Sequence, residues 1–166
     1  MEANMVAQQY KLIGPAMEQP EYNMFNRQKM ENEYLQLFKT VGLGTTIWSP
    51  LAAGLLTGKY NNGIPEGSRM AIEGFGWLKD KHLQEAHIEK VRNLQRVADQ
   101  LHCSMASLSI AWCIKNPHVT SAILGATRKE QLLENLKALD VLPLLNDEVM
   151  QQIEAIIQSK PVLSQY

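Results

Sequence analysis

The segment over residues 48–60, WSPLAAGLLTGKY, carries residue types suited to holding a phosphorylated ligand. It follows a β-branched run, as expected where a strand ends in a loop. Gly54 and Gly58 lack the Cβ atoms that would keep a phosphate away from the backbone. Trp48 offers a flat face for stacking, and Lys59 offers a point charge for phosphate. Each residue alone is common in ordinary turns, but the whole run predicts a ligand-binding loop.

A second candidate segment covers residues 121–127, where a strand leads into Gly125 and a hydroxyl group. The helix expected to follow carries Gln131, Glu134 and Asn135, spaced so that their polar ends share one face. The N–H groups and positive dipole end at a helix start favour anions. An ordinary capped surface helix gives the same pattern. This segment therefore predicts a ligand-binding site only because it would lie beside the first segment.

The helices and strands around these two segments must position them. The apolar periodicity predicts that helices and strands alternate along the chain. Helix starts are marked by Ser104, by the capping-box pattern at 127–130, and by Asn146. We expect helices over residues 2–10, 27–40, 84–101, 104–116, 127–139 and from 146 onward, strands over 12–18, 45–48 and 121–125, and an irregular excursion over 61–80.

This βα alternation predicts an α/β fold with about three parallel strands and flanking helices. Three parallel strands cannot close a barrel, and a (β/α)₈ barrel takes about 250 residues, with its site at the C-terminal strand ends. The chain has 166 residues. We therefore expect an incomplete barrel, and we interpret the chain as a fragment of a larger one.

Composition narrows the function classes. A net charge of −1 and 20% charged residues predict no broad basic surface for nucleic acid or anionic lipid. No apolar run approaches the roughly 20 residues that span a bilayer, and the polar start is unlike a signal peptide. Cys103 and Cys113 favour free thiols in a reducing cytosol, and neither the cysteines nor the four histidines show metal-ligand spacing.

A DNA-reading helix pair over 84–101 and 104–116 is an alternative from a different class. Its second helix offers only Lys115 as a cation, and Leu108 and Trp112 lie where packing would need them. This pattern disfavours nucleic acid as a partner.

The segments WSPLAAGLLTGKY and LGATRKEQLLEN are similar to those of the aldo-keto reductase superfamily, whose members bind NADP(H) across these loops of a TIM barrel. Residues 1–25, 74–81 and 159–166 resemble the cytoplasmic β subunits of Shaker-type voltage-gated potassium channels. The likeness covers the C-terminal half of that barrel. It implies the C-terminal part of a (β/α)₈ TIM barrel, with residues 1–166 forming a partial aldo-keto reductase domain.

The resemblance assigns the nicotinamide and pyrophosphate ends of the cofactor. It implies that Gln19 bonds the nicotinamide carboxamide and that Trp48 stacks on the ring. Lys59 and Arg69 would add positive charge near the pyrophosphate. The residues implied to wrap the pyrophosphate, mostly through their backbone, are Ser49, Pro50, Leu51, Ala52 and Ala53.

The adenosine end is assigned in the same way. The resemblance implies that Gly125, Thr127 and Gln131 hold the 2′-phosphate and that Glu134 and Asn135 hold the adenine. Two residues depart from the family pattern. Gly67 stands where channel subunits carry a Tyr, which removes one aromatic wall of the cleft. Thr127 replaces a Ser and keeps the hydroxyl.

The implied function is an NADP(H)-binding regulatory subunit that joins a channel α subunit at its cytoplasmic tetramerisation domain. It would form a homotetramer, lie at the plasma membrane without inserting into it, and modulate inactivation or trafficking. The superfamily's catalytic tetrad and a Ser-Arg pair stand on strands that precede these segments, and no residue here matches the acid that carbonyl reduction needs. The alternative is a fragment of a catalytic, NADPH-dependent aldo-keto reductase acting on aldehydes and ketones.

Overall fold

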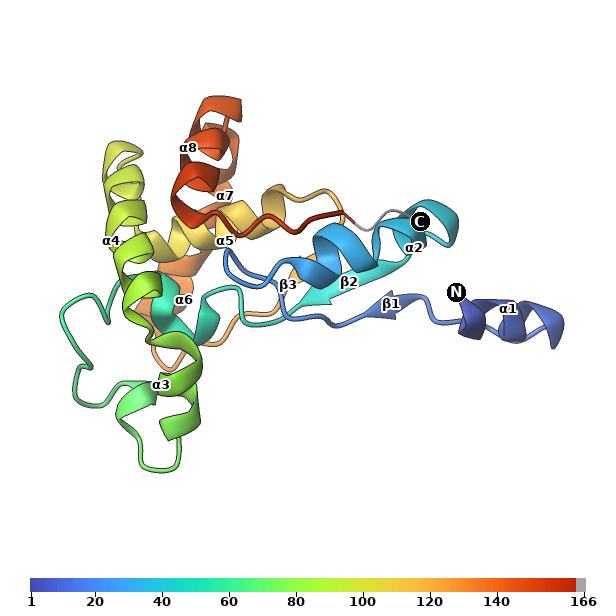
Figure 1. The fold of residues 1–166 in the computed structure, drawn as a ribbon, viewed down its shortest axis with the longest axis horizontal. Helices are drawn as coiled ribbons and strands as arrows, with labels where there is room; N and C mark the ends of the chain where they lie inside the picture. The colour runs from blue at the N-terminus through green and yellow to red at the C-terminus, as the bar shows by residue number, and fades with distance from the viewer. Residues whose placement is uncertain (164–166) are drawn as a thin grey trace.

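The computed structural model describes residues 1–163, which form an open, three-stranded parallel sheet with helices around it (Figure 1). The strands, in spatial order, are β1 (Met17–Glu18), β2 (Gly44–Ile47) and β3 (Ser121–Ala122). Met17 lies opposite Gly44, and Thr46 lies opposite Ser121. The α/β class and the incomplete barrel are thereby confirmed. The last three residues of the 159–166 segment lie outside the described residues.

The N-terminal part confirms the predicted helix and shortens the predicted strand. Helix α1 (Glu2–Gln9) lies at the end of the molecule beyond β1 (Figure 1) and buries only Ala7 among its residues. The strand expected over 12–18 is reduced to β1. Leu12 and Ile13 are exposed, so this stretch of the apolar run has no core to face. Pairing with β2 starts where Gly44 donates to the carbonyl of residue 16.

The single helix expected over 27–40 is wrong in one respect, because it divides in two. Lys29–Glu33 is a π-helical turn and α2 covers Leu35–Thr40. The N–H of Tyr34 donates to the carbonyl of Lys29, five residues back, at 2.9 Å. This wider turn keeps both Met30 and Phe38 buried.

The connection from β2 to β3 holds short 3₁₀ turns and three helices. These are η2 (Ala52–Thr57), η3 (Arg69–Ala71), α3 (Gly76–His82), α4 (Glu85–Gln100) and α5 (Met105–Lys115). The excursion predicted over 61–80 was too long, because α3 starts inside it and buries Leu78. The cap at Ser104 is confirmed, since its Oγ accepts from the N–H of Ser107 at 3.1 Å.

Helix α5 lies in the interior, and this rules it out as a helix that reads a nucleic-acid groove. All residues from Ser107 to Cys113 are buried, including Leu108 and Trp112. The core around it includes Met24, Ile47, Leu55, Leu94 and Ile153.

Between β3 and residue 163 the chain forms four helical elements. These are α6 (Lys129–Leu136), α7 (Ala138–Val141), η4 (Leu142–Leu144) and α8 (Asp147–Ile157). The cap at Asn146 is confirmed, with its Oδ1 accepting from Val149 at 2.9 Å. The continuous helix expected over 127–139 is wrong, because α6 starts two residues later and ends at Leu136. Among residues 1–163, no helix has the length and apolar character to cross a bilayer.

Candidate functional site

The segments that follow the three strands leave the sheet at one edge. The N–H of Trp48 donates to the carbonyl of Pro20 at 3.0 Å, which joins the end of β1 to the end of β2. The N–H of Ile123 donates to the carbonyl of Ile47 at 2.8 Å, which joins β2 to β3. Gln19 is exposed at this edge, and Trp48 keeps 42% of its surface exposed. Ligands of parallel α/β sheets bind outside such carboxyl ends.

The loop after β2 has an unusual backbone. Ser49, Ala52 and Ala53 have φ angles of 57°, 46° and 56°, and Gly54 follows at 94°. Residues other than glycine cost about 1–3 kcal/mol each in this left-handed region, and such residues cluster at functional sites. Ser49 supports the turn with both oxygens. Its carbonyl accepts from Ala52 at 3.0 Å, and its Oγ accepts from Ala53 at 3.3 Å.

The glycines of this loop make room for side chains of the protein itself. A Cβ on Gly54 would lie 2.8 Å from Cε and Nζ of Lys59. The Nζ of Lys59 lies 5.1 Å from the ring centroid of Tyr60, a cation–π arrangement. A Cβ on Gly58 would lie 3.1 Å from Oε1 of Gln95 in α4. The close approach predicted at these glycines therefore involves Lys59 and Gln95 in this structure.

The remaining residues predicted at this end are Pro50, Leu51 and Arg69. Pro50 is buried and Leu51 is half-buried. Arg69 lies on the excursion between β2 and α3, with its guanidinium 5.6 Å from the ring centroid of Phe75. Gly67 is exposed on the same excursion.

The segment after β3 is exposed and is held through one residue of α6. Oε1 of Gln131 accepts from the N–H and Oγ1 of Thr127, at 2.9 and 3.2 Å, and from the N–H of Arg128 at 3.3 Å. The capping box is therefore completed by Gln131, and the expectation that Glu130 completes it is wrong. Gly125 and Thr127 are both exposed.

The two residues predicted to hold adenine differ in exposure. Oε2 of Glu134 accepts from Lys137 at 2.7 Å, and its Oε1 accepts from Ser107 at 3.3 Å. Hydrogen bonds from Lys137 and from Ser104 hold the pKa of Glu134 below its usual value. Asn135, by contrast, is only 5% exposed.

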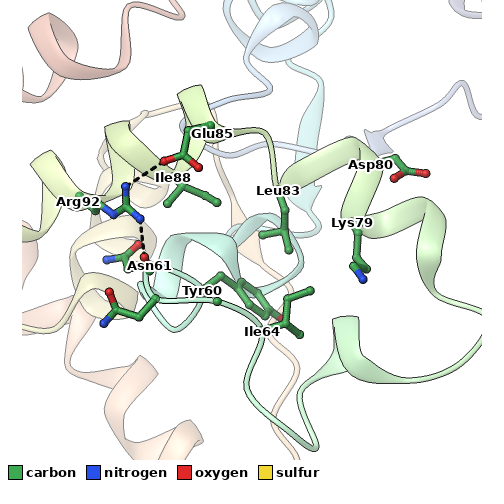
Figure 2. A pocket seen from close by; sticks show the side chains of 11 residues that line it. Tyr60, Asn61, Ile64, Lys79, Asp80, Leu83, Glu85, Ile88 and Arg92 are labelled. Carbon is green, nitrogen blue, oxygen red and sulfur yellow. Dashed lines mark hydrogen bonds and ion pairs between the residues drawn. The ribbon is translucent and has the colours of Figure 1, made fainter.

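Of two hollows among the described residues, the smaller contains a residue predicted at the site, Glu134. The larger, about 720 Å³, lies between the chain after Tyr60 and the α3–α4 corner (Figure 2). On its rim Arg92 donates to Oε1 of Glu85 at 3.0 Å and to the carbonyl of Asn61 at 2.7 Å. The smaller, about 460 Å³, includes Glu134 and Cys103. Residues 1–163 bring together no group of three His, Cys, Asp or Glu side chains able to hold a metal ion.

Sequence reasoning missed the buried polar residues that follow β1. Asn23 is 1% exposed, and its Nδ2 donates to the carbonyl of Ser49 at 3.1 Å. Its Oδ1 accepts from the N–H groups of Phe25 and Asn26, each at 3.0 Å. An Asn that bonds backbone N–H groups two and three residues on is a known turn signal, so this role could have been anticipated.

Arg27 is the second missed residue and connects distant parts of the chain. It is buried and donates to both carboxylate oxygens of Glu31, at 2.9 and 2.7 Å, and to Glu154 in α8 at 2.5 Å. Burial alone would lower the pKa of Arg27, but the bonds to Glu31 and Glu154 outweigh it and raise the pKa. The Tyr22 hydroxyl donates to Glu31 at 2.6 Å, and burial followed by the Glu31 charge raises the Tyr22 pKa.

Comparison with known proteins agrees with this architecture. Residues 2–158 match the aldo/keto reductase family, and the chain belongs to that family. It is 53% identical over 161 residues to the "Probable voltage-gated potassium channel subunit beta" of Oryza sativa subsp. japonica. It is 52% identical over 161 residues to the protein of the same name in Arabidopsis thaliana. Each match covers 96% of this chain and 49% of the relative, so the chain spans about half the length of these relatives. The predicted resemblance is confirmed.

Proposed function

We propose that the chain is the nucleotide-binding part of a cytoplasmic regulatory β subunit of a voltage-gated potassium channel, with NADP(H) as its ligand. In this proposal, residues 1–166 form a partial aldo-keto reductase domain. The observation that carries the proposal is the strained loop after β2, with exposed Trp48 at its start, beside the exposed segment after β3. The names of the plant relatives support the channel partner.

The nicotinamide and pyrophosphate end fits the residues well. Trp48 has an open face for the ring, and Gln19 is exposed beside it for the carboxamide. Lys59 is exposed, and its described partner is an aromatic ring, so its charge is available for phosphate. Arg69 is exposed on the excursion and would add a second cation. The loop from Ser49 to Gly54, which is left-handed at Ser49, Ala52, Ala53 and Gly54, would turn around the pyrophosphate.

The adenosine end needs a rearrangement. Gly125 and Thr127 are open to a 2′-phosphate, but Oε1 of Gln131 already accepts three hydrogen bonds from its own helix start. Gln131 would contact the ligand by turning its amide outward or through its Nε2 group. Glu134 and Asn135 would contact adenine only at the edge they leave exposed. We expect the affinity for NADP(H) to come mainly from contacts at the nicotinamide and pyrophosphate end.

A regulatory role is favoured over catalysis by this chain alone. Bound NADPH supplies a hydride, and carbonyl reduction also needs a group that protonates the product oxygen. The tyrosine beside the loop, Tyr60, is 1% exposed, and its hydroxyl has no hydrogen-bond partner among the described residues. Lys59 lies over the Tyr60 ring. Tyr60 therefore presents no acid to a carbonyl held at Trp48.

NADPH titration of the full chain tests the cofactor part of the proposal. We expect saturable binding, followed by nucleotide fluorescence, and a five- to hundredfold weaker affinity for Trp48→Ala, because base–aromatic stacking contributes about 1–3 kcal/mol. Trp77→Ala is the matched control, since Trp77 is 60% exposed but lies on α3. No binding by the wild-type chain, or equal loss in both variants, would contradict the proposal.

Co-purification with a channel's cytoplasmic tetramerisation domain tests the partner part. We expect the chain to be retained by that domain and to give no NADPH-dependent turnover of aldehydes. A homotetramer in the complex and a position at the plasma membrane through the channel belong to the same proposal. Aldehyde turnover without retention by the channel domain would support the alternative, a piece of a catalytic aldo-keto reductase.

A further inference from the structure

The turn after β1 is positioned to hold the backbone conformation of the loop after β2. Asn23 lies in this turn, with its N–H donating to the carbonyl of Asn26 at 3.2 Å and its carbonyl accepting from Asn26 at 3.1 Å. Its Oδ1 accepts from the N–H of Phe25 and shares the N–H of Asn26 with the Asn23 carbonyl, which fixes the orientation of the amide. The Nδ2 group is thereby directed at the carbonyl of Ser49, 3.1 Å away.

Ser49 is the first left-handed residue of the loop after β2. Its two oxygens accept from Ala52 and Ala53, so the conformation of Ser49 sets the path of the next residues. A serine at a φ of 57° is strained and persists only where its surroundings hold it. Asn23 supplies such support from outside the loop, through the peptide plane that Ser49 shares with Pro50.

The turn that carries Asn23 is itself firmly anchored. The N–H of Tyr22 donates to the carbonyl of Trp48 at 3.2 Å, so a backbone bond joins the two segments one residue before Asn23's own contact. Arg27, a few residues on, is fixed by Glu31 and Glu154. Movement of the Asn23 amide away from Ser49 would therefore require the surrounding network to move.

We propose that Asn23 is a positioning residue that holds Ser49 in its left-handed conformation and so keeps the loop after β2 in the shape that receives a dinucleotide. The geometric part of this proposal stands on the contacts described above. The part that concerns the ligand rests on the proposed function. No contact between Asn23 and the ligand is implied.

Asn23→Ser separates the two roles of the side chain. A serine hydroxyl can still accept from the turn N–H groups, but it is too short to reach the carbonyl of Ser49. That carbonyl keeps its bond from Ala52, so it is not left unsatisfied. Ile153→Val is the control for a general loss of stability, because Ile153 is fully buried in α8 and contacts neither loop through a hydrogen bond.

Amide hydrogen exchange and NADPH affinity are measured on the same full-chain proteins. For Asn23→Ser we expect about tenfold faster exchange at Ala52 and Ala53 and about tenfold weaker NADPH binding, the size of one hydrogen bond. Exchange in α4 should stay unchanged, and Ile153→Val should alter neither readout at the loop.

Unchanged exchange at Ala52 and Ala53 in Asn23→Ser overturns the proposal, as does equal acceleration by Ile153→Val. Faster exchange with unchanged NADPH affinity also overturns it, because the held shape would then be irrelevant to the ligand. If the wild-type chain binds no NADPH, the proposed function fails separately, and the exchange data alone decide whether Asn23 holds the loop.

Discussion

The segments that follow β2 and β3 start side by side but are held in opposite ways. The loop after β2 buries Ala52, Leu55 and Leu56, adopts left-handed conformations, and is bonded to the turn after β1. The segment after β3 is exposed at Gly125 and Thr127. Its described side-chain bonds run to Gln131 in the first turn of α6.

This contrast indicates which of the two segments would lose conformational entropy when a ligand binds. A loop that is already fixed loses little conformational freedom when a ligand arrives, whereas an exposed segment must be ordered at that moment. The loop after β2 would therefore present a preformed surface to the ligand. The segment after β3 would become ordered around a ligand that this loop already holds. The following changes separate these two behaviours.

The largest effect is expected for Arg27→Ala, which removes the anchor of the turn that supports the loop after β2. Glu31 and the partly exposed Glu154 would lose their shared partner, and hydrogen bonds to charged groups contribute about 1.5–3 kcal/mol each. Urea denaturation measures the loss. Arg92→Ala is the control, because its partners Glu85 and Glu89 are exposed and such pairs contribute less than about 1 kcal/mol. Equal losses in the two variants would contradict a special role for Arg27.

Alanine at one glycine of each segment compares them directly. Gly54→Ala should destabilise by about 1–2 kcal/mol, because an alanine is strained in the left-handed region and its Cβ would meet Lys59. Gly125→Ala should stay within about 0.5 kcal/mol, since a Cβ there meets open space. Thermal unfolding of both variants checks this. A loss at Gly125 as large as that at Gly54 would remove the contrast between the segments.

Gln131→Ala should loosen the segment after β3 without affecting the loop after β2. Removal of a helix cap costs about 1 kcal/mol, and here three donors lose their acceptor. Amide exchange at Thr127 and Arg128 should accelerate, while that at Ala53 should not. Gln152→Ala, which removes an exposed contact with Gln100, serves as the control and should leave all three amides unchanged.

The smallest effect concerns pH. Because hydrogen bonds from Lys137 and Ser104 lower the pKa of Glu134 in the folded state, its contribution is complete at neutral pH. It is lost as the pH falls below the ordinary glutamate range and through the lowered value. The group is partly exposed, so the contribution is less than about 0.5 kcal/mol. Unfolding curves at pH 7 and pH 3 for wild type and Glu134→Gln should differ by this amount, and an identical pH dependence would refute it.

The bounds of a helix could be predicted from the sequence where the apolar periodicity and the capping residues agree. The helices over 84–101 and 104–116 and the helix starting at Asn146 are found within a residue or two, because each has a clear apolar stripe or a capping side chain. The three strands were found, and the middle one is within a residue of its predicted bounds, but those predicted over 12–18 and 121–125 were too long, since apolar residues such as Ile13 and Ile123 remain exposed beside this open sheet. The prediction of a single helix over 27–40 is wrong because a π-helical turn interrupts it. The apolar pattern of this segment gives no sign of that turn.

For the candidate site, the sequence indicated which segments meet but not how they are held. The order β1-β2-β3 brings Gln19, Trp48 and the segment after β3 to one edge, as parallel strands require. The left-handed angles at Ala52 and Ala53 have no signal in their residue types. Asn23 and Arg27 carry weak local signals, a turn and an i,i+4 charge pair, but their long-range partners Ser49 and Glu154 are set by tertiary packing alone.

The bond network around Arg27 also reaches past the last helix. Ser159 accepts from Arg27 at 3.2 Å and donates to the carbonyl of Met24 at 2.6 Å. A version of the chain trimmed after residue 157, or fused there to a bulky tag, would remove or displace this serine. Such an alteration would loosen the turn that carries Met24 and Arg27, more than a hundred positions away in the sequence.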